Sequence, residues 1–152
     1  MVGVYLLFLV SAAVSILLYG AQKSAVKIGF GLSAISCFYA LCYFVANMGV
    51  TQGFALGGDF LYAPKFELTP LGNFFSFVVV FIGFASSVYG MSYAEEYIKK
   101  ANVGVFACLF NLFILSMLLV ISANNVFCFV VLWELMTLIS SLLILVNDGK
   151  GT

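Results

Sequence analysis

The 152-residue chain is 64% hydrophobic and only 8% charged, with as many acidic as basic residues. Because a water-soluble fold needs polar groups to cover its surface, this composition excludes an ordinary soluble domain and favours a membrane protein. The zero net charge offers no basic surface for nucleic acid, and the absence of Arg and His removes the commonest general base and transition-metal ligand.

Five apolar runs are long enough to be membrane helices, since about 20 residues span the hydrocarbon core. They cover residues 4–19, 26–48, 73–93, 103–121 and 125–146. The first run lacks the charged start of a secretory signal and is followed by more membrane sequence, so we expect it to be retained. The sequence therefore predicts an all-α integral membrane protein of about five transmembrane helices, in one domain over residues 1–152.

The connection between the second and third runs, residues 49–72, is longer than the others. It carries a Gly-Gly-Asp sequence at 57–59 between short segments with aromatic residues, a pattern typical of a β-hairpin. Pro64 limits this hairpin to an edge-like ribbon. Pro70 then stands where the third helix begins, because a missing N–H costs nothing in the first turn. We expect a small extramembrane hairpin between the second and third helices.

The placement of lysines predicts the orientation of the helices. One side of the predicted membrane holds five of them, at Lys23, Lys27, Lys99, Lys100 and Lys150. The other side holds only Lys65, in the hairpin connection. Because cytoplasmic loops carry the excess of lysine, we expect a multi-pass protein of the cytoplasmic (inner) membrane, with the N-terminus and the hairpin outside and the C-terminus inside.

Small residues recur at spacings of three and four in two of the runs. The second run has Gly29, Ser33, Ser36 and Ala40, and the third has Ser76, Gly83, Ser87 and Gly90. Such faces let helices approach closely in lipid. We interpret them as packing surfaces, with a substrate path along the serines as the less favoured alternative.

The four cysteines give no sign of a metal or iron–sulfur site. They are Cys37, Cys42, Cys108 and Cys128. All lie inside apolar runs without a C-x-x-C spacing, whereas zinc and iron–sulfur sites need clustered thiolates. We interpret them as small apolar packing residues.

Glu134 is the strongest candidate for a functional residue, because it is the only charged residue deep inside any of the five runs. A carboxylate near the bilayer centre costs about 2.5–3.5 kcal/mol or more. It either stays neutral or ionises beside a buried cation, and this chain has no such cation at that depth. Thr137 and Ser141 share its helix face at i+3 and i+7. We predict that Glu134 relays protons, with a purely structural hydrogen-bonded Glu as the alternative.

Asn111 is the second polar residue placed near mid-membrane, in the fourth run. An amide there needs a hydrogen-bond partner, since an unpaired polar group in hydrocarbon costs several kcal/mol. An interhelical hydrogen bond is the simpler interpretation. The alternative is that Asn111, like Thr137 and Ser141, is a polar neighbour of an ion path.

Several segments resemble a known family. Trp-Glu-Leu-Met at 133–136, followed by Leu-Ile-Ser-Ser at 138–141, resembles the fifth helix of the antiporter-like membrane subunits. Residues 69–75 and 86–93 are similar to the two ends of that family's third helix. This superfamily includes the proton-pumping subunits of respiratory complex I, the multisubunit cation/proton antiporters and the membrane arms of group-4 hydrogenases. Within it the chain looks closest to the large membrane subunit of formate hydrogenlyase and related type-4 hydrogenases.

The resemblance implies an ion-translocating, specifically proton-translocating, membrane-arm subunit of a redox-driven complex. It covers only the start of the family's fold, so we expect this chain to be the N-terminal portion of a larger unit, completed by another polypeptide or truncated. Family members pair the fifth-helix Glu, here Glu134, with a Lys on a later helix that this chain lacks. The resemblance also implies other membrane subunits and a peripheral redox arm as partners, and iron–sulfur and nickel–iron centres in those partners rather than in this chain.

Two other functions fit the same residues. One is a membrane scaffold that assembles such a complex without pumping. The other is a subunit of a multisubunit cation/proton antiporter. Catalytic chemistry in this chain itself is not expected, because no second ionisable group lies at the depth of Glu134.

Overall fold

The computed structural model describes residues 1–18, 22–55, 65–97 and 102–148. Within these ranges the chain forms five α-helices and two β-strands. They are α1 (Val2–Leu17), α2 (Gln22–Ala46), β1 (Gln52–Ala55), β2 (Lys65–Leu68), α3 (Pro70–Tyr97), α4 (Val103–Ser122) and α5 (Val126–Asp148). The predicted all-α membrane fold is confirmed.

Four of the described helices are long and apolar enough to cross a membrane. The spans are Lys27–Ala46, Pro70–Ser92, Val103–Ser122 and Val126–Val146. The remaining helix, α1, has 16 residues, which at 1.5 Å per residue makes it about 24 Å long. It is thus shorter than the roughly 30 Å hydrocarbon core. The chain is a multi-pass membrane protein.

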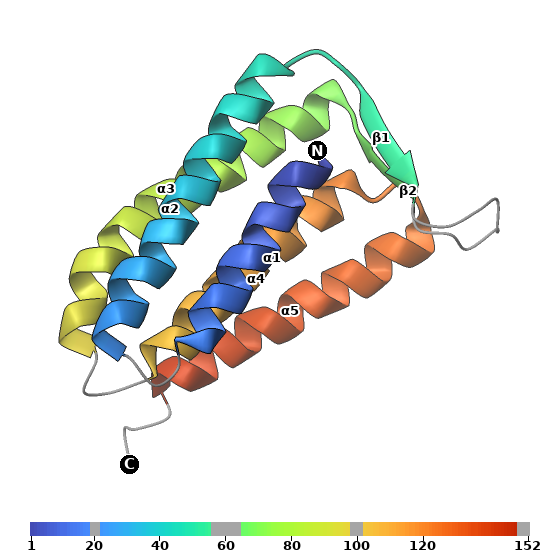
Figure 1. Ribbon diagram of the computed structural model, residues 1–152. Helices are drawn as coiled ribbons and strands as arrows, with labels where there is room; N and C mark the ends of the chain where they lie inside the picture. The colour runs from blue at the N-terminus through green and yellow to red at the C-terminus, as the bar shows by residue number, and fades with distance from the viewer. Residues whose placement is uncertain (19–21, 56–64, 98–101, 149–152) are drawn as a thin grey trace.

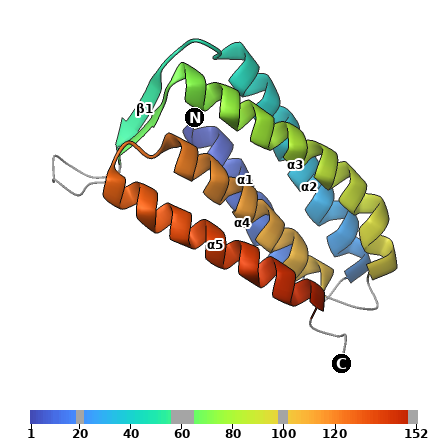
Figure 2. The same cartoon turned by 180° about the vertical axis from the view of Figure 1, so that it is seen from behind.

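Helix α4 lies at the centre of the bundle and packs against α1, α2, α3 and α5. Helices α2 and α3 form the most extensive pair, on one side of α4. Helix α5 lies along the opposite edge of the molecule in both views and packs mainly against α4 (Figures 1 and 2). One long side of α5 therefore faces away from the rest of the described chain.

The predicted hairpin is present as a two-stranded antiparallel ribbon. Strands β1 and β2 pair Phe54 with Phe66, and Pro70 is the first residue of α3, as its missing N–H favours. The predicted turn at 57–59 and Pro64 lie outside the described residues.

The hairpin also holds the short connection between α4 and α5. Phe66 forms an isolated bridge with Ala123, and the Asn124 backbone N–H donates to the Lys65 carbonyl at 2.9 Å. The Asn124 side-chain amide donates to the Glu67 carboxylate. Because these contacts fix the start of α5, the hairpin sets where that helix begins relative to α4.

The small-residue faces predicted for α2 and α3 are buried except at the half-buried Gly90, and they bring helices close together. A Cβ added at Gly29 would lie 3.0 Å from the Ala107 Cβ and 3.1 Å from the Ser15 Oγ. A Cβ at Gly83 would lie 2.8 Å from the Ile114 side chain. These positions have no room for a side chain, so the predicted packing role is confirmed.

Two helix boundaries differ from the prediction. Helix α2 begins at Gln22, so Lys23 and Lys27 lie in its first turns instead of in a loop. Helix α3 continues to Tyr97, past the apolar run that was predicted to end at residue 93. Apolar runs mark only the part of a helix inside lipid, and residues such as Glu extend a helix readily beyond it. Lys99, Lys100 and Lys150 lie outside the described residues.

Candidate functional site

Glu134 lies close to the middle of the membrane-spanning part of α5. That span runs from Val126 to Val146, so Glu134 is two residues from its centre, or about 3 Å along the helix axis. Its side chain is exposed on the surface of the described chain. In a membrane this places a carboxyl group at mid-depth, where nothing from the described residues donates a hydrogen bond to it.

The two polar neighbours predicted for Glu134 lie on the same outward side of α5. The Thr137 hydroxyl donates to the backbone carbonyl of Glu134 at 2.7 Å. Ser141 is exposed one turn further along. The backbone thus holds the hydroxyl of Thr137. Glu134, Thr137 and Ser141 form a polar stripe on α5, and the Glu134 carboxyl is its main free polar group.

The opposite side of α5 is apolar and packs on α4. Its buried residues are Cys128 and Ile139. At 100° per residue both lie well over a quarter turn away from Glu134. Helix α5 therefore has one face that completes the bundle and another that carries the polar stripe.

Asn111 lies in a different place from Glu134. It is fully buried in α4 and donates to the Ser33 Oγ of α2 at 2.6 Å and to the Ala107 carbonyl at 2.9 Å. The interhelical hydrogen bond expected for this amide is present. Its Oδ1 atom has no hydrogen-bond partner among the residues that the structure describes. The structure brings Asn111 together with α2 and not with the polar stripe of α5.

A polar cluster at the hairpin end of the bundle was not predicted. The Tyr43 hydroxyl bonds both the Met1 amino group and the Gln52 side chain, and the Gln52 amide donates to Asn47 Oδ1 at 2.5 Å. The Asn73 amide donates to two backbone carbonyls just after α2. The signal was the recurrence of amide side chains at the ends of apolar runs, where backbone groups need partners.

The cysteines and carboxylates do not gather into a metal site in the described part of the chain. No three His, Cys, Asp or Glu side chains there lie close enough to hold a metal ion. Cys37, Cys108 and Cys128 are buried, Cys42 is exposed, and all four are free thiols.

Two known proteins are similar to this chain. Hydrogenase-4 component B of Escherichia coli is 29% identical over 95% of the chain. A Staphylococcus saprophyticus protein named antiporter subunit mnhA2 is 40% identical over 88 residues, or 57% of the chain. The predicted resemblance to antiporter-like and hydrogenase-type membrane subunits is confirmed. No protein-family model matches the chain.

The similarity to these antiporter-like subunits covers only part of each relative. The chain spans 22% of the length of the hydrogenase component and 10% of that of the antiporter subunit. Nearly all of this chain therefore corresponds to a fraction of a longer hydrogenase component.

Proposed function

We propose that this chain is a proton-translocating membrane-arm subunit, or the N-terminal part of one, in a redox-driven complex such as a group-4 hydrogenase, a formate hydrogenlyase or a relative of complex I. The similarity to hydrogenase-4 component B supports the type of complex. The single observation that supports the role is Glu134, a carboxyl group at mid-span on the uncovered face of α5.

The free-energy cost of a charge at this depth makes the position of Glu134 informative. An ionised carboxylate facing lipid near the bilayer centre costs about 2.5–3.5 kcal/mol or more. The described residues offer no amine at that depth, since Lys27 and Lys65 lie at the ends of the bundle. A cation for Glu134 therefore has to come from another helix that covers this face of α5.

Such a pair would act as a proton switch. While a lysine ammonium lies beside Glu134, the carboxylate stays ionised because the cation offsets its loss of hydration. When the cation moves away, an ionised carboxylate in hydrocarbon becomes costly and Glu134 takes up a proton. When the cation returns, Glu134 releases the proton. Thr137 and Ser141 would provide hydroxyl groups on the same side of the helix for the proton's path.

This chain performs no bond chemistry in the proposal. Oxidation and reduction would take place at iron–sulfur and nickel–iron centres in partner subunits of a peripheral arm, and other membrane subunits would carry the rest of the ion path. We also propose that the complex lies in the cytoplasmic membrane with the N-terminus outside. Met1, the hairpin and the α4–α5 connection lie together at one end of the bundle (Figure 1), so they would share the outer side.

A second candidate is a subunit of a multisubunit cation/proton antiporter. The 40% identity to an antiporter subunit over 57% of the chain favours it. The two functions differ in what drives proton movement. In the first it follows the oxidation of hydrogen or formate, and in the second it follows an imposed sodium or potassium gradient without any redox substrate.

The test is the variant Glu134→Gln, which keeps the size and shape of the side chain but removes its charge and its ability to bind and release a proton. Inverted membrane vesicles that contain the assembled complex would be monitored with a pH-sensitive dye during turnover. We expect Glu134→Gln to reduce proton uptake to background while the subunits still co-purify. Glu67→Gln is the matched control, because Glu67 lies in the hairpin and its oxygen would still accept from Asn124.

Unchanged proton uptake by Glu134→Gln would contradict the proposal. Loss of co-purification together with uptake would instead support the scaffold function, in which Glu134 holds subunits together.

A further inference from the structure

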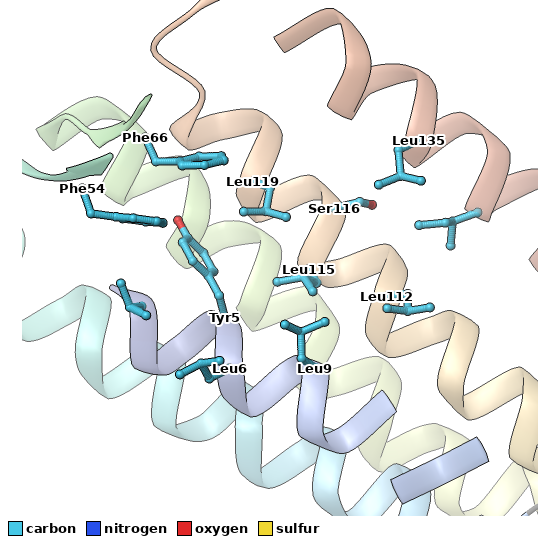
Figure 3. A pocket seen from close by; sticks show the side chains of 12 residues that line it. Tyr5, Leu6, Leu9, Phe54, Phe66, Leu112, Leu115, Ser116, Leu119 and Leu135 are labelled. Atoms are coloured by element: carbon cyan, nitrogen blue, oxygen red, sulfur yellow. The ribbon is translucent and has the colours of Figure 1, made fainter. Parts of the chain in front are cut away.

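A cavity of about 460 Å³ lies between α1, α4, α5 and the hairpin. Leucines from three helices point into it, among them Leu9, Leu115 and Leu135 (Figure 3). Its walls are almost entirely apolar, and its volume falls within the roughly 300–1,000 Å³ of ligand pockets. The cavity is partly open, because α1 and α5 both pack on α4 without closing over it.

The end of the cavity next to the hairpin is lined by aromatic side chains. Phe54 and Phe66 stack with ring centroids 5.0 Å apart, and the Tyr5 ring lies 6.1 Å from that of Phe54. The Tyr5 hydroxyl points away to Ser122, to which it donates at 3.0 Å. The cavity is therefore apolar even where it meets the polar end of the bundle.

The size of the cavity decides which occupant fits. One turn of α-helix, 5.4 Å long and roughly 10 Å across, already fills about 420 Å³. The cavity has room for about one such turn, so it cannot enclose a membrane-spanning helix, although a helix could lie over the opening. A flexible hydrocarbon chain fits, since it is narrow and makes no hydrogen bonds that the leucines would leave unpaired.

The surroundings of the hairpin end of the cavity suit the headgroup of a lipid. Phe54 and Phe66 also line a hollow at the hairpin, whose polar side chains include Lys65, Glu67 and Asn124. Lys65 is exposed there. The aromatic pair thus separates an apolar cavity from a surface that bears an ammonium group, at the level where the membrane meets water. This spatial order, an apolar cavity next to a positively charged group, matches an acyl chain followed by a phosphate.

We propose that the cavity between α1, α4 and α5 binds one acyl chain of a membrane phospholipid, with the headgroup phosphate near Lys65. The lipid fills the gap that the short helix α1 leaves beside α4. On α5 the cavity is lined by Leu135 and Ile139, which lie about 100° and 140° around the helix from Glu134, so the Glu134 carboxyl is not part of this site.

Native mass spectrometry of the purified protein, after exchange into lipid-free detergent, tests the proposal. We expect the unaltered protein to retain one phospholipid per chain and Leu9→Trp to lose it, because the indole fills the cavity. Val10→Trp is the matched control, since it adds the same group to the next residue of α1, which is exposed and does not line the cavity. Retention by Leu9→Trp, or no retained lipid in the unaltered protein, would overturn the proposal.

A second measurement needs no altered side chain. A phospholipid with a diazirine at the end of one acyl chain would be photolysed in vesicles containing the protein, and the labelled peptides would be mapped. We expect labels to concentrate on the Leu112–Leu119 segment of α4, where Leu112, Leu115 and Leu119 line the cavity. Equal labelling of Phe81 and Ile82, which are exposed on α3, would mean ordinary lipid contact only and would overturn the proposal. Neither measurement depends on proton transport, so its result is separate from that of Glu134→Gln.

Discussion

Helices α4 and α5 are neighbours of similar length and apolar character, yet they have opposite environments. In α4, 44% of the membrane-spanning window is buried, whereas in α5 only 6% is buried. Each carries one strongly polar residue near its middle. Asn111 of α4 is bonded to α2, and Glu134 of α5 faces outward.

The difference shows how depth and burial act separately in a membrane protein. Both polar groups lie deep in the bilayer, where water cannot satisfy them. Asn111 finds its partner within the chain, in a hydrogen bond that links α4 to α2. Glu134 finds none among the described residues, which is why we propose that a partner on another helix covers it.

The largest effect on stability is expected from truncating a leucine on α4. Leu118 is fully buried, and Leu118→Ala should lower the free energy of unfolding by about 2–5 kcal/mol, because it leaves a void among packed side chains. Leu138→Ala on the outer face of α5, where the side chain is 59% exposed, should change it by less than about 0.5 kcal/mol. Unfolding of the purified chain in mixed micelles with increasing SDS measures both. Equal losses would show that the two helices do not differ as described.

A smaller loss is expected where α2 approaches α4. Gly29→Leu would place a side chain against Ala107 and Ser15, and overpacking of this kind costs about 1–3 kcal/mol. Gly31→Leu is the matched control in the same helix, because an added Cβ there meets nothing within 4 Å. Thermal unfolding in detergent would compare them. A Gly29 variant as stable as the Gly31 variant would contradict the close contact between these helices.

The smallest loss is expected from Asn111→Leu. It removes the hydrogen bond to Ser33, and such interhelical bonds contribute about 0.6–1.7 kcal/mol. Ser33 would keep its own bond to the Gly29 carbonyl, which limits the cost. Proton uptake should continue in this variant, in contrast to Glu134→Gln. Loss of uptake with an intact fold would place Asn111 on the ion path.

Much of the fold could be predicted because apolar runs, glycines and proline carry their meaning locally. The hairpin, the start of α3 at Pro70 and the close packing at Gly29 followed from such signals. The environment of each helix could not be predicted in the same way. Lipid is as apolar as a protein core, so α4 and α5 have similar sequences although one is enclosed and the other is not.

For the candidate site too, the sequence predicted depth in the membrane but not the environment of each side chain. Depth in the membrane singled out both Glu134 and Asn111, because depth depends only on position along a run. Which of them faces the bundle depends on contacts between distant segments, such as that of Asn111 with Ser33, 78 residues away. The hydroxyl of Thr137 was placed on the correct face, but its bond to the backbone depends on a side-chain rotation that the sequence does not specify.

The most direct test of the account is the structure of the assembled complex at a resolution that shows side chains. The account predicts that another helix covers the outer face of α5 and places a lysine nitrogen within about 4 Å of the Glu134 carboxylate, the distance of an ion pair, in at least one state of the working complex. A Glu134 side chain that faces lipid in every state, with no cationic group near it, would contradict the account.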